Sequence, residues 1–252
     1  MIDSHAHLAS QRFDGDRPGV LQRAWDAGLA HVVVIGETSS AARDLARTDP
    51  RRLSFTAGVH PHEAHTFDAE RHIAAIRELI GDGAVAIGEC GLDYHYDHSP
   101  RELQLIAFQQ QLDLAAELRV PVVVHTREAE GDTISMLGAA AARGVCGVLH
   151  CFTGSLALAR AAVDVGWYIS ISGIATFTTW DRDDVVAMVP DRQLLVETDS
   201  PYLAPVPFRG KRNESSFLPR TIERLATVRD TSAEQLASLT AMNAIRFFRL
   251  PL

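Results

Sequence analysis

Short apolar runs alternate with longer amphipathic stretches along almost the whole chain. The apolar runs are rich in Val, Ile and Leu and are bounded by Gly, Pro, Asp or Ser, which predicts short strands. Because these strands are apolar almost throughout, they are typical of a parallel sheet that is covered on both faces. The eight predicted strands are residues 1–7, 30–36, 53–59, 84–89, 121–126, 145–150, 167–172 and 193–198.

The amphipathic stretches between the strands predict helices. They cover residues 16–28, 39–48, 69–81, 100–118, 130–143, 155–166 and 181–189. Eight strand–helix units in 252 residues give about 31 residues each, close to the size of a βα unit. This alternation favours a parallel α/β architecture, and eight units favour closure into a (β/α)8 barrel, the TIM barrel fold.

A long loop at residues 200–214 follows the eighth strand and leads to two further predicted helices, 215–229 and 232–249. No linker, low-complexity tract or change of composition interrupts the chain. We therefore expect residues 1–252 to form a single domain.

Six residues of metal-binding types stand at or just after the ends of five predicted strands. His5 and His7 are two positions apart on the first strand, so both side chains point to the same face. The other four follow later strands: Glu89, His125, His150 and Asp199. The carboxyl ends of barrel strands meet at one mouth, where active sites form, so these residues are expected to converge. A single rim histidine could simply bond to a carbonyl, but a buried set of six without a metal would leave costly unpaired polar groups.

Six ligands exceed the protein ligands of a typical catalytic zinc site, which predicts two divalent cations, with Mg, Mn or Zn as candidates. Glu89 lies between the two histidine pairs in barrel order and is the predicted bridge. The predicted division is His5, His7, Glu89 and Asp199 on one cation, and Glu89, His125 and His150 on the other. Bound cations would activate a water molecule, and Asp199 is predicted to accept the proton of that water. Asp199 and the bridge Glu89 are therefore the predicted catalytic residues. Lys211, the only lysine, lies in the loop after the eighth strand, so a carboxylated lysine cannot replace the carboxylate bridge.

The motifs around these residues resemble those of the TatD family of metal-dependent deoxyribonucleases. They are DSHAHL (3–8), GVHPHEA (58–64), AIGECGLDY (86–94), PVVVHTREA (121–129), HCFTGS (150–155), SISGI (170–174), ETDSPYLAP (197–205) and RGKRN (209–213). The resemblance covers essentially the whole chain. It implies a (β/α)8 barrel and a two-metal site on the same six ligands. It also implies phosphodiester hydrolysis of DNA, often as a 3′–5′ exonuclease on single strands, with RNA sometimes accepted.

Further polar residues near the expected mouth are candidates for binding substrate. For His60 and His62 in GVHPH we favour contact with a substrate phosphate over metal ligation, with ordinary surface-loop histidines as the alternative. Arg127 could hold a phosphate, as could Arg209 and Lys211 in the loop after the eighth strand, where barrel phosphates often bind. A plain surface salt bridge is an equal alternative for each of these three cations.

Two residue types beside the ligands have predicted supporting roles. Glu197 faces the same side of its strand as Asp199 and is predicted to orient the ligands from behind, with a buried structural carboxylate as the equal alternative. Cys90 and Cys151 each directly follow a ligand, so strand alternation predicts that both pack outward against helices.

The net charge of −8 argues against broad electrostatic capture of nucleic acid, although bound cations would reverse the sign of a local site. A nucleic-acid substrate is therefore expected to bind only at the barrel mouth. No apolar stretch is long enough to span a bilayer, and no basic segment followed by an apolar one precedes the first strand. Three cysteines without CxxC spacing suit a reducing compartment. We expect a monomeric, cytoplasmic protein without a membrane partner.

Two other functions are compatible with the same residues. Two cations that polarise a carbonyl would also hydrolyse an ester or amide, for example an aminoacyl-tRNA ester, because the fold alone does not select the substrate. A metal-dependent binding protein without catalytic activity is the second alternative.

Overall fold

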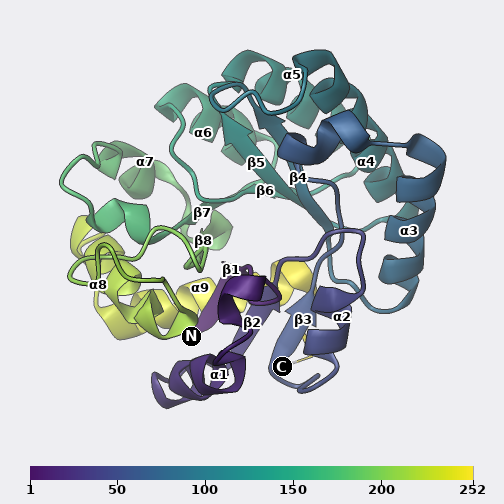
Figure 1. The fold of residues 1–252 in the computed structure, drawn as a ribbon. Helices are drawn as coiled ribbons and strands as arrows, with labels where there is room; N and C mark the ends of the chain where they lie inside the picture. The colour runs from purple at the N-terminus through teal and green to yellow at the C-terminus, as the bar shows by residue number, and fades with distance from the viewer. Residues whose placement is uncertain (252) are drawn as a thin grey trace.

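The computed structural model describes residues 1–251, in which eight parallel strands surround a common axis and helices cover them from outside (Figure 1). The strands are β1 (Ile2–Ala6), β2 (His31–Val34), β3 (Leu53–Phe55), β4 (Ile87–Asp93), β5 (Val122–Arg127), β6 (Gly147–Leu149), β7 (Tyr168–Ile171) and β8 (Leu194–Val196). They pair in chain order within two sheets, β1 to β3 and β4 to β8. Parallel bridges Ala6–Ser200 and Ala57–Ile87 join the two sheets, which confirms the predicted (β/α)8 barrel.

Successive valines show how the apolar runs form this barrel. Val33 packs in the barrel interior with Val123 and Leu195. Its neighbours Val32 and Val34 point the opposite way, into the larger core beneath the helices. Because successive side chains of a strand alternate between faces, a strand that is buried on both faces must be apolar at every position.

Nine α-helices lie among the described residues. They are α1 (Arg17–Asp26), α2 (Ala41–Ala46), α3 (Ala69–Gly81), α4 (Arg101–Leu118), α5 (Glu130–Ala142), α6 (Leu156–Asp164), α7 (Asp183–Met188), α8 (Leu218–Val228) and α9 (Ala233–Phe248). A capping box at Ser232 begins α9, which packs on β1 and β8 and closes one end of the barrel (Figure 1). None of the helices within residues 1–251 is long and apolar enough to cross a membrane.

The fourth strand differs from its predicted range of 84–89. The observed β4 pairs with β5 as far as Asp93, opposite Arg127. Glu89 therefore lies inside the strand, and four further residues follow it before the turn. The difference arises because the two glycines and the acidic residues of GECGLD interrupt the apolar pattern by which we placed the end of the strand.

Candidate metal centre

The carboxyl ends of the strands surround a cleft of about 720 Å³. Its walls include five of the six predicted ligands, together with His60 and His62. The sixth predicted ligand, His5, is fully buried beneath them. The six residues that were predicted from the strand ends therefore lie together in the structure.

Backbone and side-chain hydrogen bonds fix the first strand against the segment that follows β8. The Asp3 carboxylate accepts hydrogen bonds from the backbone N–H and the hydroxyl of Thr198, at 2.9 and 2.6 Å. One residue further, the N–H of Asp199 donates to the carbonyl of His5 at 3.0 Å. These bonds hold the carboxylate of Asp199 beside the imidazole of His5, although the two residues lie at opposite ends of the barrel sequence.

Glu89 stands between two groups of histidines, and each of its carboxylate oxygens faces one group. Oε2 lies 3.5 Å from Nε2 of His5 and 3.5 Å from Nε2 of His7. Oε1 lies 2.6 Å from Nε2 of His150 and 3.2 Å from Nδ1 of His125. A carboxylate with one oxygen directed at each of two nitrogen groups has the arrangement that a bridging ligand needs.

The first nitrogen group fits a single cation. The Nε2 atoms of His5 and His7 are 3.2 Å apart, and Oδ1 of Asp199 lies 3.7 and 3.5 Å from them. Two nitrogens at 2.0–2.1 Å from a tetrahedral zinc ion are about 3.3 Å apart. The observed spacing of the two nitrogens therefore matches that of two ligands of one ion.

His150 faces both parts of the centre. Its ring stacks on the ring of His5 with centroids 3.9 Å apart, and the ligand atoms of His5, Glu89 and His150 all lie within 4.8 Å of one another. This geometry would allow His150 to bind either cation, whereas the sequence predicted only the second.

Unpaired buried polar atoms provide a test of whether these residues suit cations. Oε2 of Glu89, Nδ1 of His5 and Nε2 of His150 are buried and have no hydrogen-bond partner within residues 1–251. Although Nε2 of His150 is close to Glu89, the two groups are not aligned for a hydrogen bond. Buried polar groups without partners are costly, and a cation would satisfy Oε2 and Nε2 directly. The residues present fit divalent cations.

The electrostatics of the centre point the same way. Burial lowers the pKa of His150, but the carboxylates of Glu89 and Glu197 outweigh burial and hold that pKa well above its usual value. Burial raises the pKa of Asp199, but His7 and His5 outweigh it and lower that pKa. The potential at His150 therefore favours positive charge, and Asp199 is held in the ionised form that can bind a cation.

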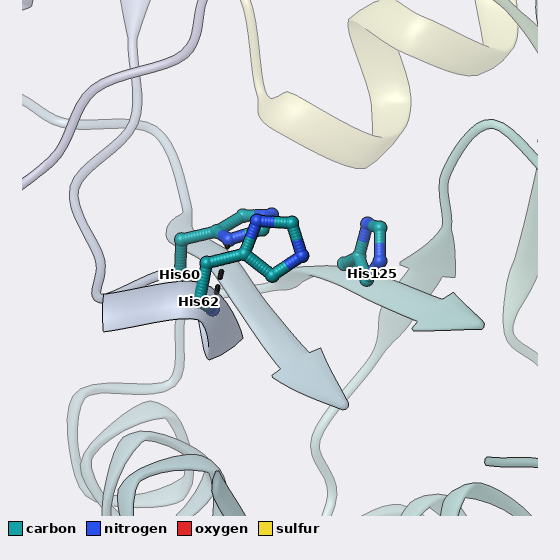
Figure 2. Close-up of side chains that lie close together, drawn as sticks. All are labelled: His60, His62 and His125. Carbon is teal, nitrogen blue, oxygen red and sulfur yellow. Dashed lines mark hydrogen bonds between the residues drawn. The ribbon is translucent and has the colours of Figure 1, made fainter. Parts of the chain in front are cut away.

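A third group of ligand atoms lies at the outer side of the centre. His60 and His62, from the turn after β3, face His125 on β5, and their ligand atoms lie within 4.8 Å of one another (Figure 2). Nε2 of His60 is 3.3 Å from Oε1 of Glu89. His60 thus lies close to the same oxygen of Glu89 that faces His125 and His150. Contact of His60 and His62 with substrate remains a prediction.

Comparison with known proteins places this geometry in a family. A family model described as TatD related DNase matches residues 2–249. This chain belongs to the TatD family. The TatD exonuclease of Erwinia tasmaniensis, named a 3′-5′ ssDNA/RNA exonuclease, is 38% identical over 259 residues, which cover 99% of this chain and 100% of that protein. YabD of Bacillus subtilis, an uncharacterised metal-dependent hydrolase, is 38% identical over 254 residues, 99% of each chain.

The solved structures agree with the family assignment. The crystal structure of YJJV, a TatD homologue from Escherichia coli K12, superposes with a TM-score of 0.91 and 29% identity, covering 100% of this chain and 98% of that one. This chain is therefore a TatD-family metal-dependent hydrolase.

Of the three basic side chains that were predicted to bind substrate in this TatD protein, not all lie at the cleft. Arg127 lines it, with its guanidinium 5.7 Å from the ring centre of Tyr96. Arg209 and Lys211 do not line the cleft. The guanidinium of Arg209 lies 3.6 Å from the ring centre of Phe177, which gives that residue a packing contact in this structure. Substrate binding by these three cations remains a prediction.

Asp93 is a functional residue that the sequence analysis missed. Its buried Oδ2 accepts hydrogen bonds from Nε2 of His62 and Nε2 of His125, both at 2.9 Å. Its Oδ1 accepts from the backbone N–H groups of His95 and Tyr96. Burial raises the pKa of Asp93, but these hydrogen bonds outweigh burial and hold it far below its usual value. Asp93 therefore fixes the orientation of a predicted ligand and of a predicted substrate-contacting histidine at once.

The predictions for Glu197, Cys90 and Cys151 had different outcomes. Oε1 of Glu197 lies 3.2 Å from Nδ1 of His150 and accepts the backbone N–H of Cys151 at 2.8 Å, a position from which it orients His150. Cys90 is buried, but the outward prediction for Cys151 was wrong, since Cys151 lines the cleft. The reason is that β6 ends at Leu149, and Cys151 has a left-handed backbone with φ of 41°, so strand alternation no longer applies.

Proposed function

We propose that this protein is a phosphodiester hydrolase that removes nucleotides from the 3′ end of single-stranded DNA. The observation that carries the proposal is the position of Glu89, whose two oxygens face separate nitrogen groups. The substrate class is supported by the exonuclease named for the Erwinia relative, which aligns with this chain over its full length.

Two divalent cations, Mg, Mn or Zn, would stabilise charge on the phosphate oxygens and lower the pKa of water when bound. His5, His7 and Asp199 would hold one of them, and His125 and His150 the other, with Glu89 shared. Water adds to phosphorus, the bond from phosphorus to the leaving oxygen breaks, and a phosphate monoester and an alcohol result. Asp199 accepts the proton of the water, which is then available to the leaving oxygen.

The outer residues of the cleft would position the strand. His60, His62 and Arg127 line the same cleft as the predicted ligands, so we propose that they contact a phosphate at the centre. The cleft of about 720 Å³ suits a terminal nucleotide and its neighbour better than a long duplex. Nucleic acid is therefore proposed to bind locally at the barrel mouth. The monomeric state and the cytoplasmic location remain predictions.

The test uses metal-loaded protein with 5′-labelled single-stranded DNA, single-stranded RNA and an aminoacyl ester, with Mg, Mn and Zn compared. The matched control is His125→Ala, which removes one predicted ligand. The proposal predicts a ladder of products shortened from the 3′ end, lost in the control. Release from the ester alone would instead support an esterase on the same barrel. Metal binding without turnover of any substrate would support a binding protein.

A further inference from the structure

A second cleft, of about 350 Å³, lies at the opposite end of the barrel from the metal centre. It opens at the amino-terminal ends of β5, β6 and β7, and none of the residues that line it belongs to the metal centre. Tyr168 and Phe247 are buried and form apolar wall, beside Val120 and Pro121. Four exposed arginines complete the lining: Arg119, Arg143, Arg246 and Arg249.

The lining of this arginine cleft is positively charged, and within residues 1–251 only one of its four arginines forms an ion pair. None of its described residues is Asp or Glu, although the whole chain has a net charge of −8. Arg143 forms an ion pair with Asp113, and Arg246 donates to Oδ1 of Asn243 at 3.3 Å. By contrast, the guanidinium groups of Arg119 and Arg249 make no hydrogen bond or ion pair within residues 1–251. The positively charged side chains of Arg119 and Arg249 are thus available to a ligand.

The backbone at these two arginines has an unusual form for their residue type. Arg119 caps the carboxyl end of α4 and Arg249 that of α9, both in the left-handed region with φ of 56° and 54°. Glycine is the usual residue at such a position. Cations near helix carboxyl ends offset the helix dipole, which accounts for positive charge at each end separately. The helix dipole does not account for the apolar cleft that the four arginine side chains share.

We propose that the arginine cleft binds a small phosphate monoester of the nucleoside monophosphate class. Guanidinium groups match phosphate oxygens two at a time, and Arg119 and Arg249 approach from two different helix ends. The Tyr168 hydroxyl makes no hydrogen bond to another residue in the described part of the chain and is a further donor. The apolar wall of Phe247 and Val120 suits the organic part of the ligand. The volume falls at the lower end of the range for small-molecule sites.

Cys146 makes the proposal testable, because it lines this cleft while Cys90 is buried and Cys151 lines the metal cleft. Metal-loaded protein is alkylated with iodoacetamide at constant ionic strength, and peptide mapping gives the rate at each cysteine. The probes are deoxyadenosine 5′-monophosphate, inorganic phosphate and a single-stranded oligonucleotide. The mononucleotide is expected to slow alkylation of Cys146 saturably, about fivefold at four times its Kd.

The double variant Arg119→Gln/Arg249→Gln should lose this protection while it keeps its metal content and unfolding midpoint. Arg160→Gln, an exposed arginine on α6 that lines neither cleft, should retain it. An unchanged rate with all probes, or equal protection in the double variant, would overturn the proposal. Equal protection by inorganic phosphate, or protection by the oligonucleotide alone, would show that the cleft serves a different ligand.

Discussion

Replacing Asp93 with asparagine exchanges an oxygen that accepts two hydrogen bonds for an amide nitrogen that donates them. Oδ2 of Asp93 lies 2.9 Å from Nε2 of His125, while Nδ1 of His125 lies 3.2 Å from the predicted bridge Glu89. An ionised carboxylate can only accept, so it keeps the proton of His125 on Nε2 and leaves the lone pair of Nδ1 free for a cation. An amide that donates to Nε2 would move the proton to Nδ1 and block that lone pair.

The magnitude follows from the role of such a partner. Loss of a hydrogen-bonding partner behind a metal-ligating histidine costs about 10- to 100-fold in metal affinity, or about 1.4–2.7 kcal/mol. Since His125 contributes to only one of the two predicted cations, Asp93→Asn should weaken one binding event and leave the other. The backbone N–H groups of His95 and Tyr96 still find an acceptor in the asparagine oxygen, so the fold should persist.

Calorimetric titration of metal-free protein with Zn or Mn measures both binding events. Asp97→Asn is the matched control, because Asp97 is an exposed acid four residues later, outside the cleft, and its left-handed backbone tolerates asparagine. We expect two events in the wild type and the control, and one weakened event in Asp93→Asn. Two unchanged dissociation constants in folded Asp93→Asn would refute the tautomer argument.

Three other changes test separate parts of the structure. Arg127→Ala removes a positively charged side chain from the cleft and should raise KM roughly 10- to 100-fold at nearly constant kcat. This magnitude corresponds to the loss of a charged hydrogen bond of about 1.5–3 kcal/mol. A fall in kcat alone would contradict a binding role. Phe248→Ala leaves a cavity at a buried position where α9 closes the barrel. Urea titrations should show a free energy of unfolding that is lower by about 3–5 kcal/mol, and a loss below about 1 kcal/mol would argue against that packing. Burial lowers the pKa of His31, whose ring contacts Ser54 and the carbonyl of Arg51, so its stabilisation is present above pH 6.5 and declines as the pH falls toward the folded-state pKa. The stability gap between wild type and His31→Gln should therefore narrow from pH 7.5 to 5, and a constant gap would contradict this assignment.

The barrel and the ligand set could be predicted from the sequence because both depend on regular features. Apolar runs buried on both faces define the strands, and parallel strands bring their carboxyl ends to one mouth. His5, His7 and His125 could therefore be placed together without any knowledge of their contacts.

Features that depend on local backbone geometry could not be predicted in this way. Asp93 was missed because the end of β4 was predicted at Glu89. In the longer observed strand the two residues are four positions apart, a spacing at which side chains point to the same face. Cys151 was misplaced because its left-handed backbone breaks the alternation. The arginine cleft combines Arg119 with Arg249, and only the packing of α9 against the barrel end brings these two helix ends together.

The metal content of Glu89→Ala shows whether Glu89 bridges the centre, because Glu89 is proposed to bind both cations. Wild-type protein and the variant are loaded with the same metal, passed through a desalting column and measured by elemental analysis, with circular dichroism to verify folding. We expect two metal ions per wild-type chain and the loss of both in the variant. An unchanged metal-to-protein ratio in folded Glu89→Ala would contradict the bridge.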